Sequence, residues 1–254
     1  MQFKGTTISF NGVNSTKYGL YLCNVGQGLD RQMGVNRSFT MENGNLISVT
    51  DDSPTFDIQL IKLDKHSDPA PITDADLFEI KRWLYSPKDF KPLIIDRQPV
   101  VYYGMFVQGQ IWQNECSQGY LTLQFKLDSG HAYTTRQSSV YRVNGTKEIT
   151  LHSKHNYEVF NKIDIVIEIT SGNSFTIENK SSGQVMELKN IPSECKNIRI
   201  YNEGMEQIVD LDDPTRLLRS CFNKVFIHLV NGDNEVVIKG NGIVQFISQG
   251  KIII

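Results

Sequence analysis

The 254-residue sequence lacks closely spaced cysteines, long apolar runs and an excess of either charge. Its four cysteines, Cys23, Cys116, Cys195 and Cys221, form no C-x-x-C pair. This disfavours a zinc site, and we expect free thiols made in a reducing cytoplasm. No run approaches the ~20 apolar residues of a membrane span, nor does the start resemble a signal peptide. With 26 basic and 28 acidic residues, we expect neither nucleic acid nor a membrane as a partner.

The sequence also has little that resembles an active site or a metal site. The neighbours of His152 and His155 predict a strand or turn, which places both as surface histidines on opposite sides. Gly26–Gly28 is followed by no helix pattern, unlike a dinucleotide-binding loop. Asp51–Asp52 and Asp210–Asp213 lack the spaced oxygen ligands of a calcium loop. We expect no catalytic residue, cofactor or metal, although a carboxylate pair assembled by the fold stays open.

What the sequence has in abundance is the two-residue alternation of half-buried antiparallel strands. Leu121, Leu123, Phe125 and Leu127 share one face of a strand, with polar side chains between them. The same pattern covers 56–60 and 163–169. Asn231–Asn234 predicts a tight hairpin turn between two strands. Further strands are expected at 100–107, 175–178, 185–188, 196–201, 224–230, 235–239 and 243–247.

One helix is predicted after Thr73, whose side chain can cap it. Asp74 and Asp76 complement the positive end of the helix dipole. Leu77, Ile80 and Leu84 mark one face, which we expect to cover an open face of a sheet, and Pro87 ends the helix.

The small, polar and aperiodic segment 129–139 predicts a connection between two domains. The fold class is therefore mainly β with two domains. Residues 1–140 form the first domain, with one helix, and residues 141–254 form a second, all-strand domain. Because the apolar end Lys251–Ile254 is awkward as a free tail, the strand within 243–254 is expected to complete the first domain.

Several short motifs resemble the core of the phage distal tail protein family, the hub of long, non-contractile tails. They are Ile80–Leu84 at the helix end, the turn Asp96–Pro99 and the strand Val101–Met105 with its tyrosine pair. Phe10–Ser15 followed by Tyr18–Leu20 is similar to the opening of that family. These motifs cover the first half of the chain, and the second half is similar only in layout.

The resemblance implies a fold, an assembly and a set of partners. The first domain would be a tail-tube-like β-sandwich or barrel that forms a homo-hexameric ring, and the second a galectin-like or jelly-roll β-sandwich. The ring would join the tail tube protein to the tail-associated hub protein of the tip, and would anchor baseplate or receptor-binding proteins. The protein would be made in the bacterial host cytoplasm and built into the virion tail. Larger relatives carry an inserted carbohydrate-binding domain that this chain lacks, so we expect a scaffold.

The segment Gly26–Asn45 is too long for an ordinary connection inside a compact domain, and such segments are usually functional. It could reach a neighbouring subunit, so Arg31, Met33, Phe39 and Met41 are the expected interface residues. The alternative function is a carbohydrate-binding β-sandwich module for recognition of the host surface. An exposed aromatic cluster in the second half of the chain would favour that alternative.

Overall fold

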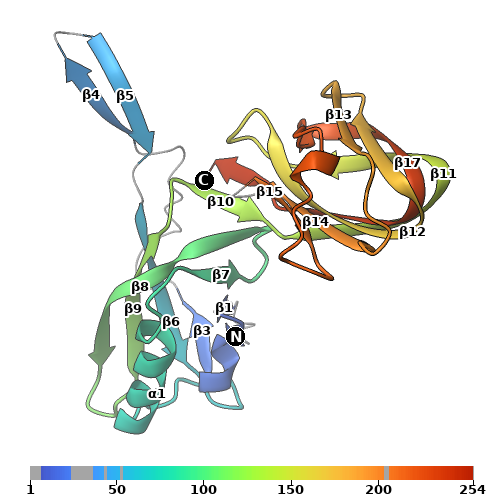
Figure 1. The fold of residues 1–254 in the computed structure, drawn as a ribbon. Coiled ribbons are helices and arrows are strands. Elements are labelled where there is room, and N and C mark those ends of the chain that lie inside the picture. Colours follow the sequence, from blue (N-terminus) through green and yellow to red (C-terminus); the bar gives the residue numbers. More distant parts are fainter. Residues whose placement is uncertain (1–6, 24–36, 43–44, 52–53, 203–205, 254) are drawn as a thin grey trace. The chain divides into compact units, whose positions relative to one another are not determined.

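The computed structural model describes residues 7–23, 37–42, 45–51, 54–202 and 206–253. The chain divides into two compact units, Met1–Tyr133 with Ile253–Ile254, and Thr134–Ile252. Within the described residues the protein is mainly β with one α-helix, in two large antiparallel sheets and one small sheet (Figure 1). The mainly β fold predicted from the alternation is confirmed.

A nine-stranded sheet forms the frame of the first unit. Its main path runs β2-β1-β7-β8-β9-β6-β3, and β10 joins it by pairing with β8 and β18. The strands are β1 (Ile8–Phe10), β2 (Val13–Asn14), β3 (Leu20–Leu22), β6 (Thr55–Lys62), β7 (Lys91–Ile95), β8 (Val100–Gln113), β9 (Gly119–Leu127), β10 (His131–Thr134) and β18 (Lys251–Ile253). A 3-10 turn, η1 (Ser15–Tyr18), separates β2 from β3.

The alternation in the sequence accounts for the core of this sheet. Leu121, Leu123, Phe125 and Leu127 on β9 are all buried, whereas the residues between them are more exposed. Phe125 makes edge contacts with aromatic rings from other strands, as at 6.1 Å from Phe10. Each strand thus directs one row of side chains into a common core.

The helix α1 (Asp74–Tyr85) lies against this core, as predicted, and it contacts β8. Thr73 Oγ1 accepts from the Asp76 amide while the Asp76 carboxylate accepts from the Thr73 amide, which completes a capping box. Ile80, Trp83 and Leu84 are buried. Burial of this one face holds the helix, because a twelve-residue helix is marginal on its own.

A seven-stranded sheet forms the second unit, in the order β11-β17-β12-β14-β15, with β13 and β16 also paired to β12. Its core is rich in isoleucine, including Ile165 and Ile167 on β12. The elements are β11 (Gln137–Ser153), β12 (Asn161–Asn179), β13 (Gln184–Leu188), β14 (Asn197–Tyr201), β15 (Gln207–Asp210), η2 (Arg219–Cys221), β16 (His228–Leu229) and β17 (Gly232–Ser248).

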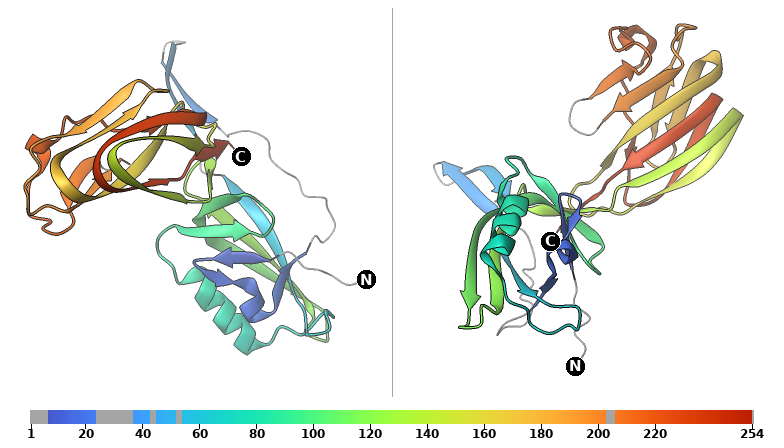
Figure 2. Two further views of the ribbon diagram at one scale, coloured as in Figure 1. Left: turned by 90° about the vertical axis from the view of Figure 1, so that its right-hand side faces the viewer. Right: turned by 90° about the horizontal axis from the view of Figure 1, so that it is seen from below.

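The three longest strands, β11, β12 and β17, bend part-way along their length, and their curvature is visible in Figure 2. Glycines with positive φ mark the bends: Gly145 (83°) on β11, Gly172 (83°) on β12 and Gly240 (146°) on β17. Gly145 and Gly240 face each other in the register of β11 and β17. Each of these three strands therefore consists of two segments that meet at a glycine.

Three local predictions are wrong. Residues 129–139 are not a plain connection, because β10 and the start of β11 lie there and His131 and Ala132 are buried. Asn231–Asn234 is not a hairpin between paired strands, because β16 pairs with β12 and β17 pairs with β11. Only His228–Leu229 of the expected strand 224–230 forms, because the segment before it runs from η2 without a partner strand.

Candidate assembly surfaces

A small two-stranded sheet carries part of the predicted interface segment. β4 (Arg37–Glu42) pairs only with β5 (Asn45–Asp51) among the described strands. Phe39 and Met41 lie on β4, opposite Val49 and Leu46, and Met41 is 56% exposed. Arg31 and Met33 lie outside the described residues. The ladder has a bulge between Thr40 and Met41, a feature that increases the local twist of an edge.

A second surface is the outer part of β8, and the sequence reasoning missed it. β7 pairs with β8 only as far as Gly104, so residues 105–113, which we call the free β8 edge, pair with β9 alone among the strands with a described register. Val107 and Ile111 are each 38% exposed there, and Trp112 is 58% exposed. The signal was present, since apolar side chains continue to alternate with glutamines well beyond residue 107.

The exposed Trp112 side chain packs against a neighbouring strand. Its ring stacks on Tyr120 across the β8–β9 ladder, with centroids 5.5 Å apart. Gly119 allows this approach, because a Cβ there would collide with the Trp112 carbonyl. An exposed tryptophan stacked on a half-buried tyrosine at the end of a strand pair is typical of a surface that another chain covers.

The family-like motifs at Ile80–Leu84 and Phe10–Ser15 meet inside the first unit. Trp83 is only 7% exposed, and its indole N–H donates to the Phe10 carbonyl at 3.1 Å. The indole also stacks on Tyr18, with ring centroids 4.9 Å apart. These motifs therefore shape the core that supports the outer surfaces and do not themselves form an exposed site.

The tyrosine pair of β8 is structural too. Tyr102 packs on the core beside Phe56 and donates its hydroxyl to Gln98. Tyr103 makes an edge contact with Tyr133 at 5.0 Å.

The two histidines considered for metal binding have unlike environments. His152 is exposed and pairs with Asp233 at 2.7 Å. His155 is buried, against our expectation, and its Nδ1 lies 3.0 Å from the Ser153 hydroxyl. The Ser153 hydroxyl accepts a hydrogen bond from the Asn161 side chain. These three buried polar side chains therefore satisfy one another at the C-terminal end of β11.

The acidic run Asp210–Asp213 forms turns rather than an ion cage. Arg216 pairs with the fully buried Asp210. Asp212 accepts from the side chain and backbone of Asn197 and the backbone of Lys196, and the Asn197 side chain chiefly lowers its pKa. Burial raises the pKa of the nearby Cys195 thiol to about 12, and all four cysteines are free. No cluster of three or more metal-ligating side chains occurs in the described parts of the chain.

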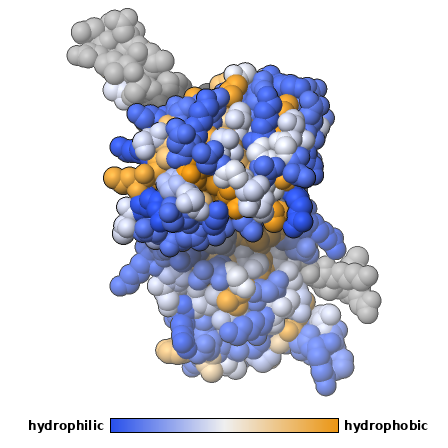
Figure 3. Space-filling view, turned by 45° about the vertical axis from the view of Figure 1, so that its right-hand side comes forward, coloured by the Kyte–Doolittle hydropathy of each residue, from blue (hydrophilic) through white to orange (hydrophobic). Residues whose placement is uncertain are grey.

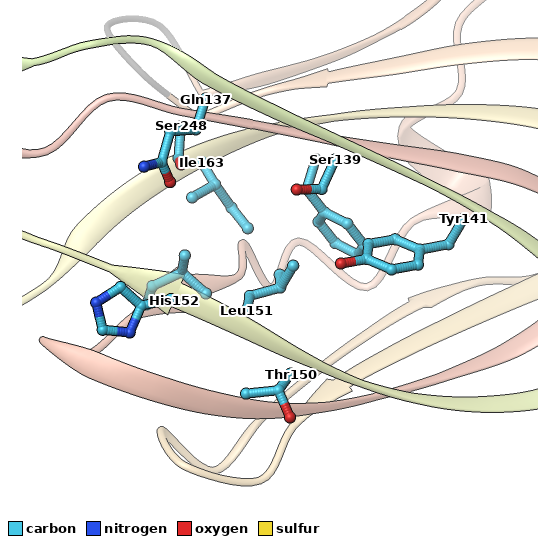
Figure 4. Close-up of a pocket in the computed structure, with 10 residues that line it drawn as sticks. Gln137, Ser139, Tyr141, Thr150, Leu151, His152, Ile163 and Ser248 are labelled. Atoms are coloured by element: carbon cyan, nitrogen blue, oxygen red, sulfur yellow. The ribbon is translucent and has the colours of Figure 1, made fainter.

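The second unit contains a cavity of about 260 Å³ between the first and the last residues of β11 (Figure 4). Both halves of the bent strand β11 border it, and the side chains of Tyr141 and Leu151 face each other across it. The residues that line it are Gln137, Ser139, Tyr141, Thr150, Leu151, His152, Ile163, Leu229, Phe246 and Ser248. The sequence reasoning missed it because it treated 129–139 as a connection.

The remaining surface carries no large apolar area on the face seen in Figure 3, where hydrophobic residues lie in small groups among hydrophilic ones. Single exposed apolar residues such as Leu217 (84%) and Val159 (79%) are ordinary on a protein surface. No helix in the described residues is long and apolar enough to cross a membrane.

Comparison with solved structures shows the same fold in phage tail proteins. The crystal structure of the Dit protein (gp 19.1) of phage SPP1, described as a paradigm of the hub adsorption apparatus in phages of Gram-positive hosts, is 12% identical with a TM-score of 0.61. That match covers 97% of this chain and 99% of the other. The baseplate of phage P2 in its activated conformation with Ca contains a chain 10% identical, with a TM-score of 0.51 and 97% of both chains covered.

The sequence comparison matches most of the first unit. No curated protein sequence matches the chain. The family described as "Phage tail protein N-terminal domain" matches residues 3–129, which contain both motif groups that pack around Trp83 and the free β8 edge. The chain therefore belongs to this family of phage tail proteins, and its fold over both units is that of the phage distal tail protein.

Proposed function

We propose that this protein is the structural hub of a long phage tail, where six copies form a ring between the tail tube and the tail tip. The observation that supports this most is the fold likeness to a hub protein over 97% of the chain. The family match to phage tail proteins is independent support, because it rests on sequence. The protein acts by holding other proteins, without catalysis.

The ring is closed by two different surfaces, as in any cyclic head-to-tail assembly. The sheet β4–β5 with Met41 and the free β8 edge with Trp112 are the two surfaces we assign to this contact. Both present strand edges, which a neighbouring subunit would protect from unwanted pairing. Of the interface residues expected from the sequence, Phe39 and Met41 lie on the first of these surfaces.

The partners follow from the place of such a ring in the tail. One face of the ring continues the tail tube, and the other seats the tail-associated hub protein of the tip. The second unit anchors baseplate or receptor-binding proteins at the periphery. The protein is made in the host cytoplasm and functions in the virion tail.

A carbohydrate-binding module is the second candidate function. The cavity of the second unit, with its aromatic and hydroxyl side chains, is the observation that favours it. The two functions are compatible in one chain, since they use different units.

Charge substitutions on the two surfaces test the ring. Met41→Lys and Trp112→Glu would each place a charge where two subunits meet. The charge would weaken the contact between subunits, whereas in the isolated subunit it would face water and leave the fold stable. We expect folded protein that fails to form rings when assembled with the tail tube and hub proteins, as seen by electron microscopy. Leu217→Lys, at an 84% exposed position of the second unit, is the matched control. Normal rings with both surface variants would remove these interface assignments.

Deletion of 28–44 tests the segment itself. It should weaken ring formation and leave the subunit folded. An unchanged six-fold ring with this deletion would show that the segment does not join neighbours.

A further inference from the structure

At the cavity of the second unit, β11 departs from the usual alternation of apolar inward and polar outward side chains. On β11 the odd-numbered residues point inward, as the buried Val143, Leu151 and Ser153 show. The first inward positions are nevertheless Gln137, Ser139 and Tyr141, all polar, although inward positions of a β-sandwich are normally apolar. The sequence has placed polar groups at inward positions bordering a cavity.

The neighbouring strands extend this polar corner and provide it with an apolar floor. In the register of β11 with β17, Gln137 lies opposite Ser248 and Ser139 lies opposite Phe246. Ile163 of β12 lies beside Ser248 on its other side. Ile163 and Phe246 are buried, together with Leu151 and Leu229 from elsewhere on the cavity wall.

The polar groups at this corner are not used by the fold. Among the described residues, the side chains of Gln137, Ser139, Tyr141 and Ser248 make no hydrogen bond to one another or to other groups. Tyr141 is half-buried, and its hydroxyl points into the space between the two halves of β11 (Figure 4). Gln137 is exposed, and Ser139, Tyr141 and Ser248 are half-buried, so a small molecule that enters the cavity can reach these unused polar groups.

The character of the wall limits the ligand. None of the lining side chains is an aspartate, glutamate, lysine or arginine, which disfavours an ionic ligand. Hydroxyls and a carboxamide offer both donors and acceptors, whereas the aliphatic and aromatic floor suits C–H groups. A volume of about 260 Å³ is below the roughly 300–1,000 Å³ of sites for drug-sized molecules.

We propose that this cavity binds a neutral, polyhydroxylated ring, the chemistry of a single hexose unit of a glycan. The ring's hydroxyls bond to Gln137, Ser139 and Tyr141, and its apolar face packs on Phe246 and Leu151. This inference rests on the second candidate function given above, and because the site lies entirely in the second unit, its occupancy does not depend on ring assembly. The affinity is low, with a Kd on the order of 1–10 mM, because a ligand of this size makes few contacts.

Nuclear magnetic resonance of the full-length chain tests the proposal, with glucose, galactose and N-acetylglucosamine as probes at tens of millimolar. We expect saturable shifts in the Tyr141 ring signals with at least one probe. Tyr141→Phe removes only the hydroxyl and should weaken binding about 5-fold, the cost of one hydrogen bond. Tyr201→Phe, on β14 and outside the cavity, is the matched control and should leave binding unchanged.

A cavity-filling variant keeps the test decisive if Tyr141→Phe has a small effect. Ser139→Leu should fill the cavity, abolish the shifts and leave the melting temperature unchanged or higher. The proposal is overturned if none of the three sugars shifts the Tyr141 signals, or if binding survives in Ser139→Leu. A folded Ser139→Leu variant that still binds would place the sugar elsewhere on the chain.

Discussion

At the scale of single residues, the two tryptophans of the chain have opposite roles. Trp83 is 7% exposed and contacts Phe10 and Tyr18, whereas Trp112 is 58% exposed. We expect Trp83→Ala to lower the free energy of unfolding by about 3–5 kcal/mol, because it empties a large aromatic site and removes a hydrogen bond. Trp112→Ala is the control and should cost less than about 1 kcal/mol. Urea unfolding measures both, and equal losses would contradict the assigned roles.

His228 gives the chain a specific pH dependence. Burial lowers its pKa, and Lys162 adds to this effect. The geometry agrees: the Gln184 carboxamide oxygen accepts from the His228 amide, so its NH2 faces Nδ1 at 3.0 Å. If Nδ1 of His228 carried a proton, its N–H would face the NH2 group of Gln184, and two hydrogen-bond donors would then point at each other. The buried Nε2 has no partner among the described residues.

The sign follows from linkage. Because the folded pKa lies below the unfolded value of about 6.5, the unfolded chain binds the proton first as pH falls. Stability should therefore decrease from about pH 6.5 downward, until the folded pKa is reached. His228→Gln should show a smaller decrease between neutral pH and about pH 5 in urea unfolding. The lowered carboxyl pKa of Asp76 acts below its ordinary value of 3.8, outside this window. Identical pH profiles would contradict this role of His228.

Individual residues were predictable where a repeating pattern applied to them. The buried face of α1 and the row Leu121–Leu127 follow from period alone. Asp164 does not, because its place in the alternation predicts a solvent-facing side chain. It is 6% exposed and accepts hydrogen bonds from Arg199 and the Asn202 amide, which lie far away in sequence. Contacts of this kind leave no local signal.

At the scale of elements, the bends of the long strands depend on glycine. Gly145 and Gly240 are register partners with positive φ, but their surroundings differ. A Cβ on Gly145 would meet no atom within 4 Å, whereas one on Gly240 would lie 2.5 Å from the Phe175 ring. The sequence alone predicted separate strands at 235–239 and 243–247, because glycines usually interrupt strands. The bend in one continuous strand depends on tertiary pairing with β11 and β12.

This difference gives a matched pair of variants. Gly145→Ala should cost about 1 kcal/mol through backbone strain alone. Gly240→Ala should cost about 2–4 kcal/mol, because the strain is joined by overpacking against Phe175. Thermal or urea unfolding of the full chain measures both. Equal costs would show that Phe175 moves aside freely.

The N-terminal end of α1 is the element whose local chemistry was most completely predicted. Thr73→Ala removes one half of the capping box and should cost about 0.5–2 kcal/mol. Asp76 also pairs with Lys62 at 2.6 Å, which ties the helix start to β6. Asp76→Asn should therefore cost more than Thr73→Ala in the same unfolding assay. The reverse order would show that the cap, not the tie to β6, fixes the helix.

At the scale of the whole molecule, two strand edges have no partner in the registers that the described residues show. The free β8 edge carries exposed Val107, Ile111 and Trp112, and β4 and β5 form a two-stranded sheet of their own. The sequence analysis proposed an interface in the segment that contains β4–β5, because of its length, and proposed none at the free β8 edge. The free β8 edge exists because β7 begins only at Lys91, opposite Gly104, and this starting point depends on pairing across the sheet.

The central claim is the position and symmetry of this protein in the tail. Cryo-electron microscopy of the assembled phage tail, with this chain identified by fitting its two units into the map, tests it most directly. The account predicts one six-fold ring of this chain at the junction of tail tube and tip, with β4–β5 and the free β8 edge at the contacts between neighbours. Finding this chain at any other place in the particle, or in a ring of another symmetry, would contradict it.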